Sequence, residues 1–107
     1  MKRTWKVAAT VCLAGLAAMP AIAQNNGMDV YQSKCQMCHG REGTGNTPAG
    51  KAIKAVSFKS PALMKATDAE LIAAVKNGKG RMPAYSGKLS DTQIKAAIAY
   101  IRKLQHS

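Results

Sequence analysis

Apolar residues return every three or four positions in three parts of the chain, a spacing that places them on one face of an α-helix. The longest of these parts predicts a helix from Asp91 to about Gln105. It opens with a capping box, in which Ser90 and Gln93 would satisfy free N–H groups of the first turn. A helix with one apolar face should bury that face against the rest of the fold. The predicted face consists of Ile94, Ala97, Ile98, Ile101 and Leu104.

Two further helices are predicted from the same pattern. One runs from Asp68 to Asn77, with a capping box made by Thr67 and Glu70 at its start and Gly78 at its end. The other runs from about Met28 to Cys38. Two of the three helices therefore carry explicit start signals.

The stretches between these helices predict loops and one short turn. The span from Gly40 to Gly50 is predicted to be a loop, because its glycines and Pro48 would break a helix. A shorter helical turn is expected to start at Ser60 and Pro61, whereas the span from Gly50 to Lys59 matches no motif. No stretch alternates between apolar and polar residues for long enough to indicate a strand. The predicted fold class is all-α.

The first 23 residues have the parts of a secretory signal peptide. Residues 1–6 carry three positive charges, residues 7–19 are apolar or small, and the segment Ala21–Ala23 has the A-x-A form of a cleavage site. The apolar run is shorter than the roughly 20 residues that a membrane-spanning helix needs. We expect cleavage after Ala23, which removes Cys12 and leaves residues 24–107 as one domain; the alternative is an uncleaved anchor.

Composition adds a constraint on the core. A chain of 107 residues with 5% aromatic residues has few large side chains with which to fill one small domain. Such a domain usually needs a disulfide, a metal, a cofactor or a partner chain. The chain is also basic: removing residues 1–23 takes away three basic residues and no acidic one, so the formal charge falls from +11 to +8.

The strongest chemical signal is the pentapeptide Cys35-Gln36-Met37-Cys38-His39, the C-x-x-C-H pattern of covalent c-type haem attachment. Two cysteines three positions apart share a helix face, so both thiols can reach the vinyl groups along one porphyrin edge. The neighbouring imidazole of His39 can then bind the iron axially. The motif predicts one covalently bound haem c.

Three other interpretations of the cysteine pair are open. A thioredoxin-like redox pair would need a βαβ pattern, which the chain lacks. A zinc site could use Cys35, Cys38 and His39, but the only other histidine is His106 near the end of the chain. The cysteines could also be purely structural.

The sixth iron ligand decides what the haem does, because methionine closes the site and raises the potential, whereas an open position suits ligand binding. Of the methionines after residue 23, Met28 precedes the first helix and Met37 lies inside the attachment motif. Met82 follows Gly80-Arg81 in a non-helical loop, where Pro83 stiffens the backbone. We therefore favour Met82 as the ligand, with Met64 as the alternative.

Taken together, these motifs make the chain resemble the class I c-type cytochromes of bacteria, small soluble proteins with one haem. The resemblance covers residues 27–105 and rests on three features in the family's order. These are Cys35 to His39 followed by Gly40, the run GKGRMPAY at 78–85, and Leu89-Ser90-Asp91 before the final helix. It implies three main helices and loops wrapped around one haem, with His39 and Met82 as iron ligands.

The resemblance also implies packing partners. Gly27 and Tyr31 correspond to first-helix positions that pack on the last helix, near Tyr100 and the small Ala97. The carbonyl of Pro48 corresponds to the family's acceptor for the Nδ1 proton of the proximal histidine.

The predicted function is that of a periplasmic one-electron carrier, and not an enzyme. The alternatives are a haem-bearing subunit of a larger dehydrogenase or oxidase, or a haem ligand-binding sensor or peroxidase-like enzyme. The expected partners are redox proteins with acidic surfaces, because basic residues lie near the predicted haem segments. Nucleic acid is not expected as a partner, nor is a membrane anchor after cleavage. The basic residues are Lys34, Lys51, Lys54, Lys76, Lys79, Arg81 and Lys88.

Overall fold

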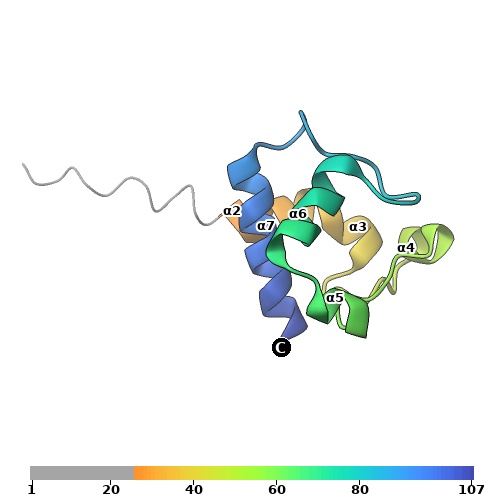
Figure 1. Cartoon of the computed structure of the whole chain (residues 1–107). Helices are drawn as coiled ribbons and strands as arrows, with labels where there is room; N and C mark the ends of the chain where they lie inside the picture. Colours follow the sequence, from red (N-terminus) through yellow and green to blue (C-terminus); the bar gives the residue numbers. More distant parts are fainter. Residues whose placement is uncertain (1–25) are drawn as a thin grey trace, which may run out of the picture.

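Two helices from distant parts of the chain cross and pack against each other (Figure 1). The computed structural model describes residues 26–107, so the predicted leader, residues 1–23, lies outside the described part. The first helix consists of α2 (Asn26–Val30), one π-helical turn, η2 (Tyr31–Cys35), and α3 (Gln36–His39). The last helix is α7 (Asp91–Gln105).

The crossing is close because Gly27 has no side chain. A Cβ atom at Gly27 would overlap the carbonyl oxygen of Ala96 in α7. One turn further, the ring of Tyr31 is fully buried and lies 5.2 Å, centroid to centroid, from the ring of Tyr100. Ala97 is also buried. The predicted packing of the first helix on the last is therefore confirmed.

The first helix contains an irregularity that the apolar pattern did not predict. In η2 the Gln36 N–H donates to the carbonyl of Tyr31, five residues back instead of four. Such π-helical turns occur mostly as single turns and often at functional sites. Here the widened turn ends at Cys35, the first cysteine of the attachment motif.

The predicted loop from Gly40 to Gly50 is wrong at its end, because helix α4 (Pro48–Ile53) begins inside it. The Thr47 hydroxyl accepts the Gly50 N–H at 2.8 Å, and Pro48 occupies the first turn, where a missing N–H costs nothing. A Cβ atom at Gly50 would overlap the carbonyl oxygen of Cys38. This glycine therefore allows α4 to approach the end of α3.

The other predicted elements are confirmed. Helix α5 (Pro61–Lys65) starts at the expected turn, and α6 (Asp68–Asn77) and α7 begin with the predicted capping boxes. Residues 26–107 contain no strand beyond isolated bridges at 79–82 and 86–89, which agrees with the all-α prediction. No helix in this part of the chain is long and apolar enough to cross a membrane. The buried apolar residues are Val30, Tyr31, Phe58, Val75, Leu89, Ile94, Ala97, Ile98 and Ile101.

Candidate functional site

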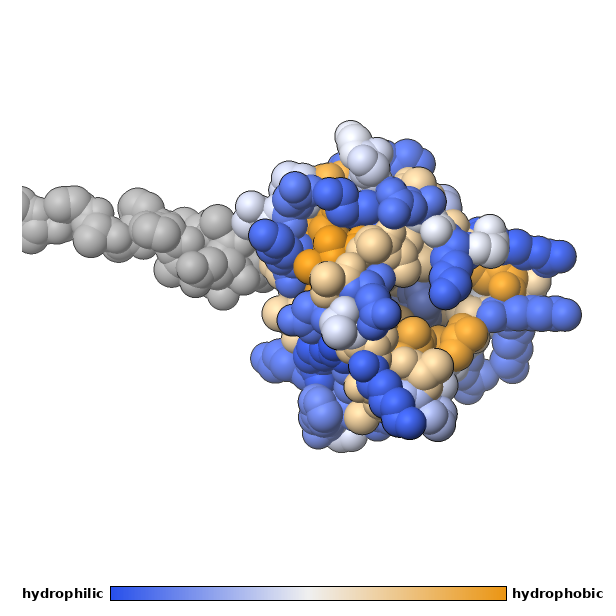
Figure 2. Space-filling view, viewed as in Figure 1, coloured by the Kyte–Doolittle hydropathy of each residue, from blue (hydrophilic) through white to orange (hydrophobic). Residues whose placement is uncertain are grey.

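The four predicted site residues line one cavity of about 460 Å³. Cys35, Cys38 and His39 reach it from the first helix, and Met82 reaches it from the loop between α6 and α7. In Figure 2 the surface is hollowed between the helical body and the segment that carries α4, with hydrophobic residues at the edge of the hollow. The cavity lies within the usual size range of ligand sites, roughly 300–1,000 Å³.

Apolar side chains make up most of the cavity wall, and basic residues make up most of its polar part. No Asp or Glu is among the described residues that line it. Of the seven basic residues expected near the haem, Lys34, Lys54, Lys79 and Arg81 line the cavity, and the other three do not. An apolar interior bordered by positive charge suits a large flat apolar group that carries acidic substituents. The apolar lining residues are Ile53, Ala55, Val56, Phe58, Ala62, Leu63, Leu71, Ala74, Val75, Pro83, Ile98 and Ile101.

Both thiols of the motif are free and partly buried. Burial, and then the neighbouring Cys38, raises the pKa of the Cys35 thiol to about 11. Net addition of one S–H group across a vinyl double bond makes one thioether. The residues present therefore fit covalent attachment along one edge of a porphyrin.

His39 presents its ring to the same cavity and stacks on Phe58, with ring centroids 4.6 Å apart and ring planes 25° apart. Burial lowers the pKa of His39, which favours the neutral imidazole that binds metals. Its Nδ1 atom is buried and makes no hydrogen bond within residues 26–107. The predicted bond from Nδ1 to the carbonyl of Pro48 is therefore absent. Pro48 lies in the first turn of α4, where a carbonyl points along the helix axis toward the next turn.

Phe58 is a site residue that the sequence analysis missed. It lies in the span from Gly50 to Lys59, for which no motif was found, and it is the only phenylalanine of the chain. Its N–H donates to the carbonyl of Gly43 at 2.8 Å, and a Cβ atom at Gly43 would overlap the Phe58 ring. Its rarity in a chain so poor in aromatic residues was the one signal that could have identified it.

A chain of polar contacts holds Phe58 from the side of α7. The buried Gln105 donates from Nε2 to the carbonyl of Phe58 at 2.9 Å. Its Oε1 accepts from Nη1 of Arg102 at 2.9 Å, and Nε of Arg102 bonds Oδ1 of Asp68 at 2.9 Å. Gln105 thus connects the ion pair of α6 and α7 to the residue that supports His39.

The segment from Gly78 to Ser86, here called the Met82 loop, is built on a tight turn. The backbones of Lys79 and Met82 exchange two hydrogen bonds, of 2.9 and 3.1 Å, and Gly80 takes a φ of 58° in the turn. Positive φ at the first central residue alone is the type II′ geometry that favours glycine. The turn places Met82 in the cavity wall, partly buried.

The other methionines after residue 23 lie elsewhere. Met64 is 39% exposed on α5 and does not line the cavity. Met28 and Met37 are 48% and 78% exposed, respectively. Of the four methionines within residues 26–107, only Met82 lines this cavity.

Two side chains tie the Met82 loop to other parts of the molecule. Nη1 of Arg81 donates to the carbonyl of Ala52 in α4 at 3.1 Å. The Tyr85 hydroxyl donates to the carbonyl of Lys34, one residue before Cys35, at 3.0 Å. The loop is thus connected both to α4 and to the helix that carries the attachment motif.

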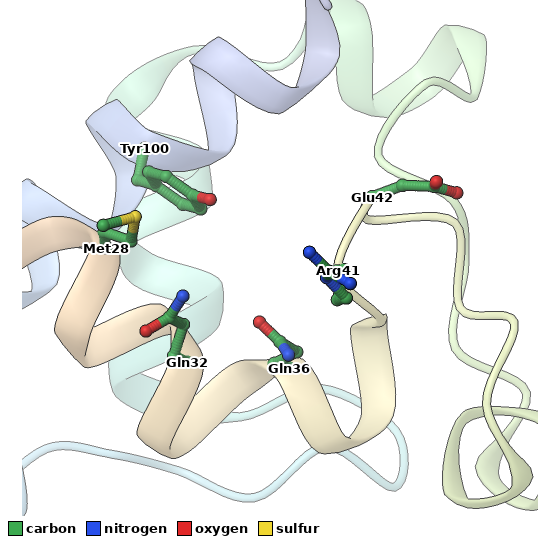
Figure 3. A pocket seen from close by; sticks show the side chains of 6 residues that line it. All are labelled: Met28, Gln32, Gln36, Arg41, Glu42 and Tyr100. Carbon is green, nitrogen blue, oxygen red and sulfur yellow. The ribbon is translucent and has the colours of Figure 1, made fainter.

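A second, more polar cavity of about 420 Å³ lies on another face of the first helix, and none of the predicted site residues line it. In Figure 3 the side chains of Gln32, Gln36 and Arg41 point into the space beside Tyr100, whereas Glu42 points away. Met28 completes the lining.

Comparison with known proteins decides the family. A family model described as cytochrome c oxidase, cbb3-type, subunit III, matches residues 22–101. The chain belongs to the c-type cytochromes. Cytochrome c6 of Leptolyngbya boryana is 36% identical over 75 residues, which cover 70% of this chain and 85% of that protein.

The relatives of this c-type cytochrome also include oxidase subunits. The cbb3-type oxidase subunit CcoP of Azospirillum brasilense is 33% identical over 86 residues, which are 78% of this chain but 29% of CcoP. Among solved structures, the KustC0563 c-type cytochrome superposes with a TM-score of 0.67 at 27% identity, covering 74% of this chain and 96% of that one. The predicted family and the predicted all-α cytochrome fold are confirmed, and family membership implies haem c as the cofactor.

Proposed function

We propose that the chain is an exported electron carrier with one covalent haem, held by thioethers to Cys35 and Cys38 and ligated by His39 and Met82. The observation that carries the proposal is that these four residues, 47 positions apart at the extremes, line one apolar cavity. Membership of the c-type cytochromes supports the cofactor and the electron-carrier role.

In this function the protein holds the haem and shields it from water. When bound, the haem supplies a one-electron couple at its iron. His39 offers a neutral imidazole whose orientation Phe58 fixes by stacking. Met82 offers a thioether, a ligand that raises the potential relative to other axial groups. The apolar wall excludes water, and no residue is assigned to bond-making or bond-breaking in a substrate.

We assign export to residues 1–23, with cleavage after Ala23 and a periplasmic location for residues 24–107. The motif supports this location, because a cofactor bonded to the chain cannot diffuse away after export.

The proposed partners are redox proteins that present acidic surfaces. Lys34, Lys54, Lys79 and Arg81 border the cavity, and no carboxylate within residues 26–107 lines it. A positive rim of this kind steers an acidic partner toward the cofactor and accelerates encounter.

Replacing Met82 by alanine tests the ligand assignment. With the thioether gone, the oxidised protein should lose its Met-to-iron charge-transfer band and bind added imidazole readily. The matched control is Met64→Ala, which removes an exposed methionine of α5 and should leave the band in place. An oxidised spectrum unchanged by Met82→Ala would favour the sensor or peroxidase-like alternative, in which the sixth position is open.

Gentle purification tests the subunit alternative. The carrier should elute alone on gel filtration at the size of one small domain. Stable co-elution with a large redox protein would instead make the chain a subunit of that complex.

A further inference from the structure

We propose that two side-chain hydrogen bonds, Tyr85 to Lys34 and Arg81 to Ala52, form a clasp that keeps the Met82 loop closed over the sixth iron position. Because the clasp acts through Met82, the proposal rests on the proposed ligation by that residue. Tyr85 and Arg81 are positioning residues, and the property they control is the access of small exogenous ligands to the iron.

The loop has few other attachments at its tip. A Cβ atom placed at Gly80 would meet nothing within 4 Å, so the turn is not packed against a neighbouring segment there. Toward the end of the loop, the N–H groups of Tyr85 and Ser86 donate to the carbonyls of Val75 and Lys76 in α6. These backbone hydrogen bonds hold the end of the loop against α6. The tip of the loop is held by side-chain contacts instead.

The clasp bonds flank Met82 along the chain and reach two different segments. Arg81, directly before Met82, bonds the carbonyl of Ala52 in α4 at 3.1 Å. Tyr85, three residues after Met82, bonds the carbonyl of Lys34 at 3.0 Å. A movement of the loop away from α4 or from the first helix therefore breaks at least one of these hydrogen bonds.

The Tyr85 bond has a second feature that fits the proposal. The Tyr85 ring is partly buried and lines the cavity. Its hydroxyl donates a hydrogen bond to the carbonyl of Lys34, the residue before Cys35. Burial, and then Cys35, raises the pKa of the Tyr85 hydroxyl, so it remains a donor. The bond thus joins the loop of the distal ligand to the helix of the attachment site.

The size of the effect follows from the net strength of one such bond. Loss of a single intramolecular hydrogen bond shifts a local opening equilibrium by about two- to tenfold. A ligand that binds only the open form gains apparent affinity in proportion to the open fraction. Removal of one clasp bond should therefore raise the affinity for an exogenous ligand by about the same factor, two- to tenfold.

The test compares Tyr85→Phe with Tyr100→Phe in the oxidised, haem-loaded protein. Both variants remove one hydroxyl from a partly buried tyrosine, but the Tyr100 hydroxyl makes no hydrogen bond to another residue of 26–107. Each protein is titrated with imidazole, and its thermal unfolding is recorded in parallel. Tyr85→Phe should keep the Met-to-iron band without imidazole and bind imidazole about two- to tenfold more tightly than the wild type. Tyr100→Phe should match the wild type.

Arg81→Met gives a second, independent test, with Arg41→Met as its control at an exposed arginine away from the Met82 loop. Arg81→Met should tighten imidazole binding as Tyr85→Phe does. The double variant should bind imidazole more tightly than either single variant. Unchanged imidazole affinity in Tyr85→Phe and Arg81→Met would overturn the clasp while leaving the ligation by Met82 intact. An equal gain in the control variants would also overturn it, because that result reflects general destabilisation. A wild-type spectrum without the band would overturn the ligation itself and the clasp with it.

Discussion

At the residue scale, the imidazole of His39 is supported by contacts that converge from three segments. Phe58 stacks on it at 4.6 Å and meets the ring of Tyr31 edge-on at 6.1 Å. Gln105 of α7 bonds the backbone of Phe58 from the other side. In the proposed ligation His39 must hold its orientation through both oxidation states, and these contacts would fix that orientation.

Replacing Gln105 by leucine should destabilise the holoprotein. The carbonyl of Phe58 would lose its buried donor, and a buried polar group left unpaired costs about 1–3 kcal/mol. Urea unfolding of the holoprotein measures this loss. Gln32→Leu, at an exposed glutamine of the first helix, is the control and should stay within about 0.5 kcal/mol of the wild type. A Gln105→Leu variant as stable as the control would contradict the supporting role.

The sequence predicted the site residues that belong to a local motif or a recognisable loop. It missed the residue that reaches the cavity only through tertiary packing. Cys35, Cys38 and His39 form one local motif, and Met82 is marked by its loop. Phe58 reaches the cavity only through the path of residues 50–59, which no local pattern specified. The predicted acceptor Pro48 was wrong because Thr47 starts a helix at that point and turns the carbonyl along its axis.

At the element scale, the crossing of the first helix and α7 sets the position of the attachment motif. Gly27 and Ala96 touch backbone to backbone at one end of the first helix. At its other end, the Tyr31 hydroxyl donates to the carbonyl of Gly40 at 2.7 Å, directly after His39. The π-helical turn lies between these two anchors, so the motif is aligned by contacts on both sides.

Replacing Gly27 by alanine should destabilise the fold although alanine is the better helix former. The added Cβ atom would overlap the carbonyl of Ala96, and overpacking of this kind costs about 1–3 kcal/mol, against about 1 kcal/mol gained in helix propensity. Thermal or urea unfolding of the holoprotein reports the balance. Gln32→Ala, at an exposed position of the same helix, serves as the control. A Gly27→Ala protein more stable than this control would show that the helices do not need their close approach.

Helix ends were predicted well where side chains mark them. Thr67 with Glu70, and Ser90 with Gln93, cap α6 and α7 as expected because a capping box is a local interaction. Helix α4 was missed because it contains Gly50, a residue that local propensity counts against a helix. The glycine is needed because of a residue twelve positions earlier in the sequence: a Cβ atom at Gly50 would overlap the carbonyl oxygen of Cys38.

At the scale of the whole molecule, composition predicted a core with few large side chains, and part of that core lines the cavity. Within residues 26–107, nine buried apolar residues form the core, and apolar side chains of α4, α5, α6 and α7 line the cavity. A domain with 5% aromatic residues thus leaves room at its centre for a large apolar group. A covalently held haem would complete the core and stabilise the folded form, because folding would remove its apolar faces from water.

The central claim is that one haem is bonded to Cys35 and Cys38 in a protein that begins after Ala23. Intact-mass measurement of the periplasmic protein, combined with a pyridine haemochrome spectrum, tests it most directly. We predict the mass of residues 24–107 plus one haem, together with a spectrum typical of two thioether bonds. A mass equal to the polypeptide alone, or a haem that acid and organic solvent extract from the chain, would contradict it.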